Sequence, residues 1–100
     1  MTKDRPAAIP TVQLENDRVK VTEWRMPPGS HTGWHRHGMD YVVVPLVSAP
    51  LEVFDGKTTQ RYDQKAGASY ARLVGVEHDV INPNDFEYSF IEIELKATVG

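Results

Sequence analysis

Residues that favour turns interrupt this chain at short intervals, which limits the length of any regular element. The interruptions are spread over most of the chain: Pro10, residues 16–17, 27–29, 48–50 and 55–56, Gly67, Gly75 and residues 82–84. Between them lie short segments rich in Val, Ile, Thr, Tyr and Phe, the residues that are enriched in β-strands. No long window repeats apolar residues with a period of 3.6. The sequence therefore predicts an all-β protein, built as a sandwich or a barrel.

Two segments predict details of individual strands. Asp55 and Gly56 lie between two such segments and favour a β-hairpin, because its tight turn needs positive φ. Residues 41–47 are apolar on both faces, so we expect a strand with protein on either side. Pro45 lies within this segment and lacks an amide donor, which predicts a bulge or the end of the strand there.

Near the carboxyl end, apolar and charged residues alternate, a pattern typical of a strand with one face in the core. We expect the following side chains to point inward: Ile91, Ile93 and Leu95. Their charged neighbours are expected to face water: Glu92, Glu94 and Lys96. The preceding aromatic residues have the opposite parity: Phe86, Tyr88 and Phe90. That aromatic face then needs a cover of its own, and we expect a second copy of the chain to supply it in a homodimer.

The length of 100 residues corresponds to one domain. We expect residues 1–10 to form an amino-terminal arm and residues 11–100 to form the domain. A formal net charge of −3 argues against a surface for nucleic acid or acidic membranes. The sequence has no cysteine, no apolar leader and no apolar stretch of the roughly 20 residues that cross a bilayer. These features predict a cytoplasmic protein that binds neither nucleic acid nor membrane.

Three of the four histidines are spaced as ligands for one metal ion. His35 and His37 are one residue apart, so on a β-strand their side chains point to the same face, roughly 7 Å apart. His78 could complete the site from a neighbouring strand. Imidazole suits Zn, Cu, Fe and Ni better than Mg or Ca. The spacing therefore predicts a transition-metal site.

The segments around these histidines resemble the two sequence motifs of the cupin superfamily. The first motif is matched at Gly29, His35 and His37. Its glutamate position falls on Tyr41, and its later glycine position falls on Ser48.

The second cupin motif is matched at every spacing by four residues: Gly67, Gly75, His78 and Asn82. Leu73 stands where proline is usual. The resemblance extends over residues 19–96 and is closest to a group of small single-domain cupins, some of which are linked with β-alanine catabolism. It implies a double-stranded antiparallel β-barrel of the jelly-roll kind, with a metal in its mouth.

By this resemblance, the metal ligands are His35, His37 and His78. The usual fourth ligand of the family is a carboxylate, and its position here holds Tyr41. A phenol ionises at about pH 10, which makes it a poor replacement. Asp40 is adjacent but out of register, so it faces the site only if a bulge turns it inward. The expected cofactor is one divalent transition metal, with Fe, Ni, Zn and Mn as the options.

Three neutral ligands leave the full charge on the metal and keep positions open for water or substrate. The first hypothesis is an enzyme that acts on a small organic, amino or keto acid, as an oxygenase, an isomerase or a decarboxylase. The alternative is a non-catalytic module that binds a small molecule or a metal and acts through a partner protein. A barrel with a vacant site is a third reading.

Further residues could contact the substrate or support the ligands: Tyr41, Asp40, Arg25 and Tyr70. Tyr41 could equally be a packed aromatic residue, and Asp40 is expected to hydrogen-bond locally. An inward-facing Arg25 could bind a substrate carboxylate, whereas Arg72 is expected to face outward. Catalytic residues stay unassigned at this point.

Residues near the motifs carry simpler expectations. His31 is expected to be exposed in its loop. Trp34 should face away from His35 and pack in an outer or intersheet layer. Asn82 is expected to be a turn residue that hydrogen-bonds local backbone.

Overall fold

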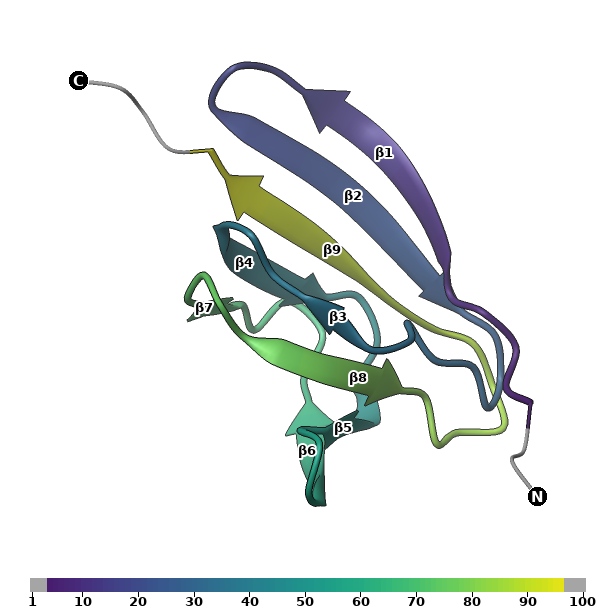
Figure 1. Cartoon of the computed structure of the whole chain (residues 1–100). Coiled ribbons are helices and arrows are strands. Elements are labelled where there is room, and N and C mark those ends of the chain that lie inside the picture. The colour runs from purple at the N-terminus through teal and green to yellow at the C-terminus, as the bar shows by residue number, and fades with distance from the viewer. Residues whose placement is uncertain (1–3, 97–100) are drawn as a thin grey trace.

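The computed structural model describes residues 4–96, which form strands and no helix (Figure 1). The strands are β1 (Ile9–Glu15), β2 (Val19–Met26), β3 (His35–Arg36), β4 (Asp40–Pro45), β5 (Ala49–Phe54), β6 (Thr59–Gln64), β7 (Tyr70–Arg72), β8 (Glu77–Ile81) and β9 (Tyr88–Leu95). Every pair of strands is antiparallel. The prediction of an all-β protein is confirmed, and the described residues hold no helix that could span a membrane.

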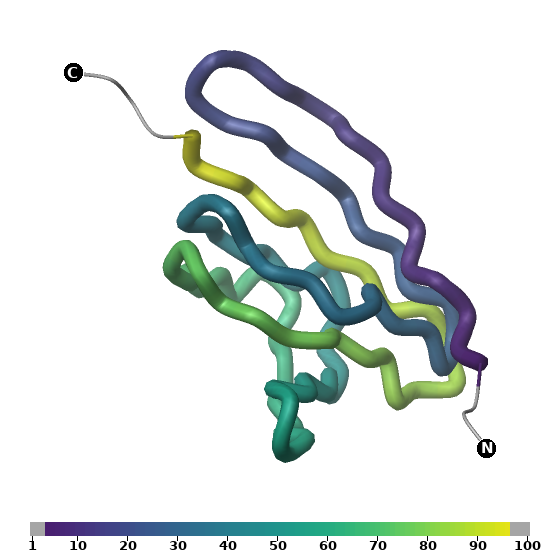
Figure 2. Tube along the Cα trace, in the orientation of Figure 1, coloured from purple at the N-terminus to yellow at the C-terminus, as the bar shows by residue number. Residues whose placement is uncertain are grey.

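The strands form two sheets with the core between them. One sheet has the order β1-β2-β9-β4-β7, and the other has the order β3-β8-β5-β6. Apart from the hairpins β1–β2 and β5–β6, each step along the chain crosses between the sheets, as in a jelly roll. In Figure 2, β1, β2 and β9 run side by side at one side of the molecule, and the β5–β6 hairpin lies on the other. The buried core cluster comprises Ala8, Met26, Tyr41, Val43, Ala49, Leu51, Val80, Tyr88 and Phe90.

The connection between β5 and β6 is the hairpin predicted at Asp55 and Gly56. Its loop spans residues 55–58, which is longer than a two-residue turn, and Gly56 has a φ of +100°. The Asp55 carboxylate accepts hydrogen bonds from the backbone amides of Lys57 and Thr58, at 2.9 and 2.8 Å. This side chain therefore satisfies loop amides that have no strand partner.

The inward face of β9 is the opposite of the predicted one. Tyr88, Phe90 and Glu92 are buried, with exposed fractions of 0%, 6% and 8%. The residues expected in the core lie on the outer face instead: Ile91, Ile93 and Leu95. β9 pairs with β2 without a register shift, so no bulge exchanges the two faces. The prediction was wrong because large aromatic side chains bury more apolar area, and because Glu92 finds polar partners inside the barrel.

β4 has apolar side chains on both faces, as predicted. Tyr41 and Val43 are buried toward the core, whereas Val42 and Val44 are half-buried on the outer face. Pro45 is the last residue of the strand and pairs with Phe90, and the Leu46 amide still donates to the Ser89 carbonyl at 3.0 Å, so the missing amide of Pro45 does not interrupt the pairing with β9.

β1 forms the outer edge of the larger sheet, and all of its residues are exposed. The chain before it is tied down by the Ala8 amide, which donates to the carbonyl of His31 at 2.9 Å. Residues 1–3 of the expected arm and residues 97–100 of the expected domain lie outside the described residues. The division into an arm over residues 1–10 and a domain over residues 11–100 stays a prediction.

Candidate metal centre

The imidazoles of three histidines converge between the two sheets. His35 on β3 and His78 on β8 are directly opposite each other in the antiparallel pair, and His37 follows β3 by one residue. The Nε2 atom of His37 lies 2.9 Å from that of His35 and 3.1 Å from that of His78. The amide of His37 donates to the Val76 carbonyl at 2.9 Å, which extends the pairing beyond β3. Strand pairing thus brings together the three histidines that the motifs predict.

The spacing of these nitrogens fits one metal ion. Metal–nitrogen bonds of about 2.1 Å at angles of roughly 90–109° place two ligand nitrogens about 3.0–3.4 Å apart. The ring planes are steeply inclined, at 75° between His35 and His37 and at 90° between His37 and His78, so the Nε2 atoms meet at their edges. A set of three imidazole nitrogens suits Zn, Fe or Ni.

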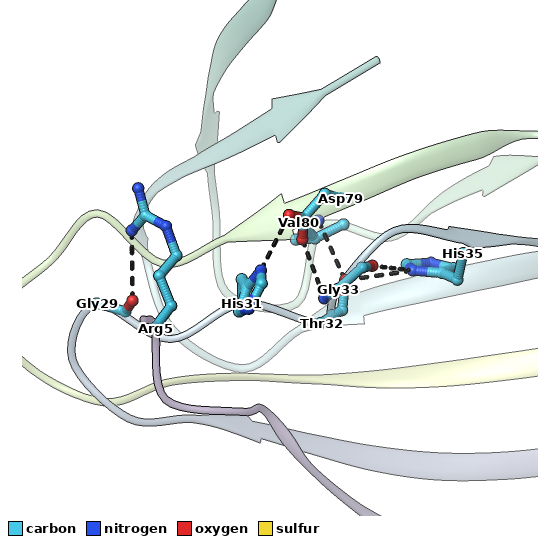
Figure 3. Close-up of polar contacts among 8 residues, drawn as sticks. All are labelled: Arg5, Gly29, His31, Thr32, Gly33, His35, Asp79 and Val80. Carbon is cyan, nitrogen blue, oxygen red and sulfur yellow. Dashed lines mark hydrogen bonds and ion pairs between the residues drawn. The ribbon is translucent and has the colours of Figure 1, made fainter. Parts of the chain in front are cut away.

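The other ring nitrogen of His35 is held by the loop before β3 (Figure 3). Nδ1 of His35 donates to the carbonyl of Gly33 at 2.8 Å, so the proton resides on Nδ1 and the Nε2 lone pair stays free. The amide of Gly33 in turn donates to the Asp79 carboxylate at 3.0 Å. Gly33 has a φ of +85°, a conformation that suits glycine.

Asp79 also binds His31, so this histidine is not the exposed residue that the sequence predicts. Nδ1 of His31 lies 2.9 Å from the second oxygen of Asp79, and the side chain is half-buried (Figure 3). Backbone bridges from His31 to Ala7 and to Ile81 hold the segment in place. His31 is half-buried, although it lies in a loop, because backbone segments at Ala7 and Ile81 pair with it on either side.

Tyr41 occupies the position where the family has its glutamate ligand. Its ring stacks on the ring of His37, with centroids 3.8 Å apart and planes inclined by 17°. The side chain is 2% exposed, and its hydroxyl has no hydrogen-bond partner among residues 4–96. Burial raises the pKa of Tyr41 well above its ordinary value, and the charge of Glu92 adds to the shift, so the phenol keeps its proton.

Glu92 is the residue of this site that sequence reasoning missed. It lies on β9, and its Oε2 atom is 3.9 Å from Nδ1 of His37. Its Oε1 atom accepts a hydrogen bond from Trp24 Nε1 at 3.4 Å. Burial raises the pKa of Glu92 to about 7, and the charge of Glu94 acts in the same direction. Tyr88 and Phe90 lie on the same face of β9 as Glu92, and their alternation in the sequence was the signal that could have placed Glu92 inside the barrel.

Two of the three histidines, His37 and His78, are held neutral at ordinary pH by a lowered pKa. Burial lowers the pKa of His37 to about 4, and the charges of His35 and His78 add to the shift. Burial likewise lowers the pKa of His78 to about 4, with further contributions from His35 and Arg72. Neutral imidazole is the form that binds metals, so the fold favours ligation.

The other residues singled out from the sequence divide between the inside and the outside of the barrel. Tyr70 is half-buried and lines the cavity, whereas Arg25 is exposed on the outer face of β2. Asp40 is exposed and accepts a hydrogen bond from the Val74 amide at 2.7 Å, so it bonds locally. Arg72 was expected to face outward, but it lines the cavity. Arg72, although exposed, therefore reaches the cavity wall, whereas Arg25, whose orientation the sequence left open, does not.

The structure also places Trp34, expected in an outer or intersheet layer, and Asn82, expected to be a turn residue. Trp34 is 52% exposed and contacts Phe54 edge-on, with centroids 6.1 Å apart. Asn82 is fully buried, and its side chain donates to the carbonyls of Met26 and Phe86 at 3.0 and 2.9 Å. It therefore joins three segments of the chain and does more than close a local turn.

The histidine cluster opens into a cavity of about 450 Å³ between the sheets. Its wall combines the histidines with aromatic, charged and aliphatic side chains, among them Trp24, Tyr41, Val43, Leu51, Tyr70, Arg72, Phe90 and Glu92. This size and mixture are typical of a site for a small molecule.

Two facing antiparallel sheets of jelly-roll connectivity, with imidazoles gathered between them, define the cupin class of protein. Solved cupins share this fold. The chain aligns with a cupin domain from Bordetella pertussis at a TM-score of 0.93 and 57% identity, over 96% of this chain and 100% of the other. A cupin superfamily protein from Desulfitobacterium hafniense is 11% identical and aligns at a TM-score of 0.71, over 97% of this chain and 84% of the other. No protein-family model matches the chain.

The chain belongs to the cupin family. Among curated proteins, the chain is similar to the beta-alanine degradation protein BauB of Pseudomonas aeruginosa. The two are 50% identical over 92 residues, which cover 92% of this chain and 97% of the relative. The resemblance predicted from the motif residues is confirmed.

Proposed function

We propose that this protein binds one divalent transition metal through His35, His37 and His78 and acts on a small organic acid. The observation that carries the proposal is the approach of His37 Nε2 to His35 Nε2 at 2.9 Å and to His78 Nε2 at 3.1 Å, at the wall of a cavity. Such a metal, when bound, supplies a Lewis acid with positions open to substrate or water. The donor set accommodates Fe, Ni, Zn and Mn.

The substrate class follows from the relative and from the cavity. BauB is named for the degradation of β-alanine, a small amino acid, and half of its residues are shared with this chain. The cavity of about 450 Å³ holds a molecule of that size, and the charged side chain Arg72 lies in its wall. We therefore propose a small organic, amino or keto acid as substrate, with oxygenation, isomerisation or decarboxylation as the reaction.

The test loads metal-free protein in turn with Fe(II), Ni(II), Mn(II) and Zn(II) and presents each form with a panel of short amino and keto acids. We expect turnover with one metal, monitored by NMR of the acid and by oxygen uptake. The His35→Ala variant serves as the control without a complete site. If none of the four forms converts any acid, the enzymatic proposal is overturned.

A second function is favoured by one specific observation, the tyrosine in place of the glutamate ligand. Tyr41 packs against His37 and leaves the donor set one carboxylate short. A weaker metal site suits a non-catalytic module that senses a small molecule and acts through a partner protein. Metal-dependent binding of an acid without any turnover would favour this second function over the first.

We also propose that the protein is a cytoplasmic homodimer. The outer face of the larger sheet carries a continuous set of half-buried apolar side chains: Val19, Val21, Val42, Val44, Ile91 and Ile93. A second copy of the chain would cover this face, which is the reverse of the face that the sequence suggested. Analytical ultracentrifugation should show a dimer that Ile93→Glu dissociates, and a single species of monomer mass would contradict the proposal.

A further inference from the structure

Arg72 is an exposed residue of β7 that lines the cavity at the histidine cluster, six residues before His78 in the sequence. It stands on β7 directly opposite Tyr41 on β4, and the ring of Tyr41 stacks on His37. Side chains that are opposite each other in an antiparallel pair lie about 5 Å apart at Cβ. The ring of Tyr41 therefore lies between β7, which carries Arg72, and the imidazole of His37.

The guanidinium of Arg72 is held in place without being neutralised. Its Cζ atom lies 5.4 Å from the centre of the Tyr70 ring, within the range of a cation–π contact. Among residues 4–96, no carboxylate lies within 4.0 Å of its nitrogens. Glu92, which lines the same cavity, is directed toward His37 and Trp24. The planar N–H donors of Arg72 are therefore available to a ligand.

The hydroxyl of Tyr41 is a second unused donor at this place. The side chain is 2% exposed, and its oxygen is fully enclosed without a partner in the described part of the chain. A buried polar group without a partner is unfavourable, so such a group points to a bound molecule that satisfies it. The phenol carries its proton at neutral pH and can donate to an oxygen of that molecule.

We infer that Arg72 and the hydroxyl of Tyr41 form a carboxylate-binding subsite next to the histidine cluster. The inference rests on the proposed function, since it names the end of the cavity that holds the acid group of the substrate. A short acid binds there with its carboxylate on the guanidinium and its remaining polar group toward the histidines. This specificity element selects a ligand with two polar ends that are a few carbon atoms apart.

The probe is malonate, compared with malonamide, in which both carboxylates of malonate are replaced by uncharged amides. Isothermal titration calorimetry on the zinc-loaded protein should show malonate binding at least about 10-fold more tightly, because a hydrogen bond to a charged group is worth that factor or more. Arg72→Met should weaken malonate binding about 10- to 100-fold and leave malonamide nearly unaffected. Arg72→Lys should recover only part of the loss, because an ammonium lacks the bidentate geometry.

Arg61→Met is the matched control, since Arg61 is an exposed arginine on β6 outside the cavity wall. It removes the same charge and should leave malonate affinity unchanged. Tyr41→Phe should weaken malonate about 10-fold. Equal malonate affinities in the Arg72→Met and Arg61→Met variants would overturn the subsite, as would equal binding of malonate and malonamide by the unaltered protein.

Failure of the subsite and failure of the proposed function give different results. If zinc does not bind the unaltered protein, the metal site is refuted, and the same malonate series on metal-free protein still tests Arg72. Zinc affinity measured separately should be equal in the Arg72→Met and Arg61→Met variants. Far-ultraviolet circular dichroism and a thermal melt of each variant establish that the barrel is folded.

Discussion

The carboxylate oxygen Oε2 of Glu92 lies 3.9 Å from Nδ1 of His37, on the side of the imidazole that faces away from the other two histidines. Metal-binding histidines commonly have a carboxylate or carbonyl at the second ring nitrogen, which orients the ring and makes it a better ligand. Here the carboxylate comes from β9, whereas the family motif places one on β4. The buried acid thus lies next to the ring nitrogen of His37 that faces away from the metal position, where it is placed to orient this ligand.

Removal of this carboxylate should weaken metal binding. Glu92→Leu is expected to reduce zinc affinity about 10- to 100-fold, since outer-shell partners have effects of that size. Glu92→Gln keeps an acceptor oxygen and should lose less. Competition with a chromogenic chelator measures both constants, and Glu23→Gln on the outer face of β2 is the control. Unchanged affinity in Glu92→Leu would show that His37 needs no support.

Loss of a histidine should abolish metal binding without unfolding the barrel. His35→Ala or His78→Ala leaves only two imidazoles, and neither residue belongs to the buried apolar core. Elemental analysis of metal-loaded protein should therefore give no metal, while circular dichroism retains the β-sheet spectrum. Full metal content in His78→Ala would contradict the assigned ligand set.

The stability of the metal-free protein should depend on pH in two opposing ways. His37 and His78 have pKa values lowered to about 4, so the unfolded chain binds more protons than the folded one between pH 4 and about 6.5, and stability rises with pH there. Glu92 has a pKa raised to about 7, so its contribution falls with pH between about 4.5 and 7.

Because two histidines oppose one glutamate, the net free energy of unfolding should increase from pH 4 to 6.5. Urea denaturation at intervals of pH measures it, and Glu92→Gln should make the increase steeper, by about 1–3 kcal/mol after solvent screening. A flat profile in both proteins would mean that these groups titrate normally.

Asp79 should affect metal binding through the loop that it holds. Its carboxylate accepts the amide of Gly33, whose carbonyl fixes the proton of His35 on Nδ1 (Figure 3). Asp79→Ala frees this loop and is expected to weaken zinc binding about 10-fold. Asp79→Asn retains an acceptor and should recover most of the affinity. Equal affinities in the two variants would show that the hydrogen bond is irrelevant.

Tyr41→Phe should leave the ligand-free protein as stable as before, or more stable by about 1 kcal/mol, because it removes a buried hydroxyl that has no partner. The stacking on His37 is retained in phenylalanine. Thermal and urea denaturation of the metal-free variant provide the measurement. A clear loss of stability would mean that the hydroxyl has a partner within the folded chain.

Much of this architecture could be predicted from local sequence patterns. The turn residues and β-rich segments indicated the all-β class, and Asp55 with Gly56 indicated the hairpin. The spacing of His35 and His37 indicated a pair of ligands, because residues two apart on a strand point to the same face. His78 was implied by the resemblance to the second cupin motif. The half-buried position of His31 was not predictable, since it depends on Asp79 from a distant strand.

The sequence by itself thus determined the class of fold and the three candidate histidines, because the turn residues and the two motifs are each recognised within a short segment. The tertiary structure decided which other side chains join them. β9 has apolar residues at both parities, and a period of two is compatible with either face turned inward. Only the packing of the two sheets selects Tyr88 and Phe90 for the core, and this choice carries Glu92 inside. Pairing of β7 with β4 likewise turns Arg72 toward the cavity, while Arg25 faces out, because orientation is set by strand partners that lie far apart in the sequence.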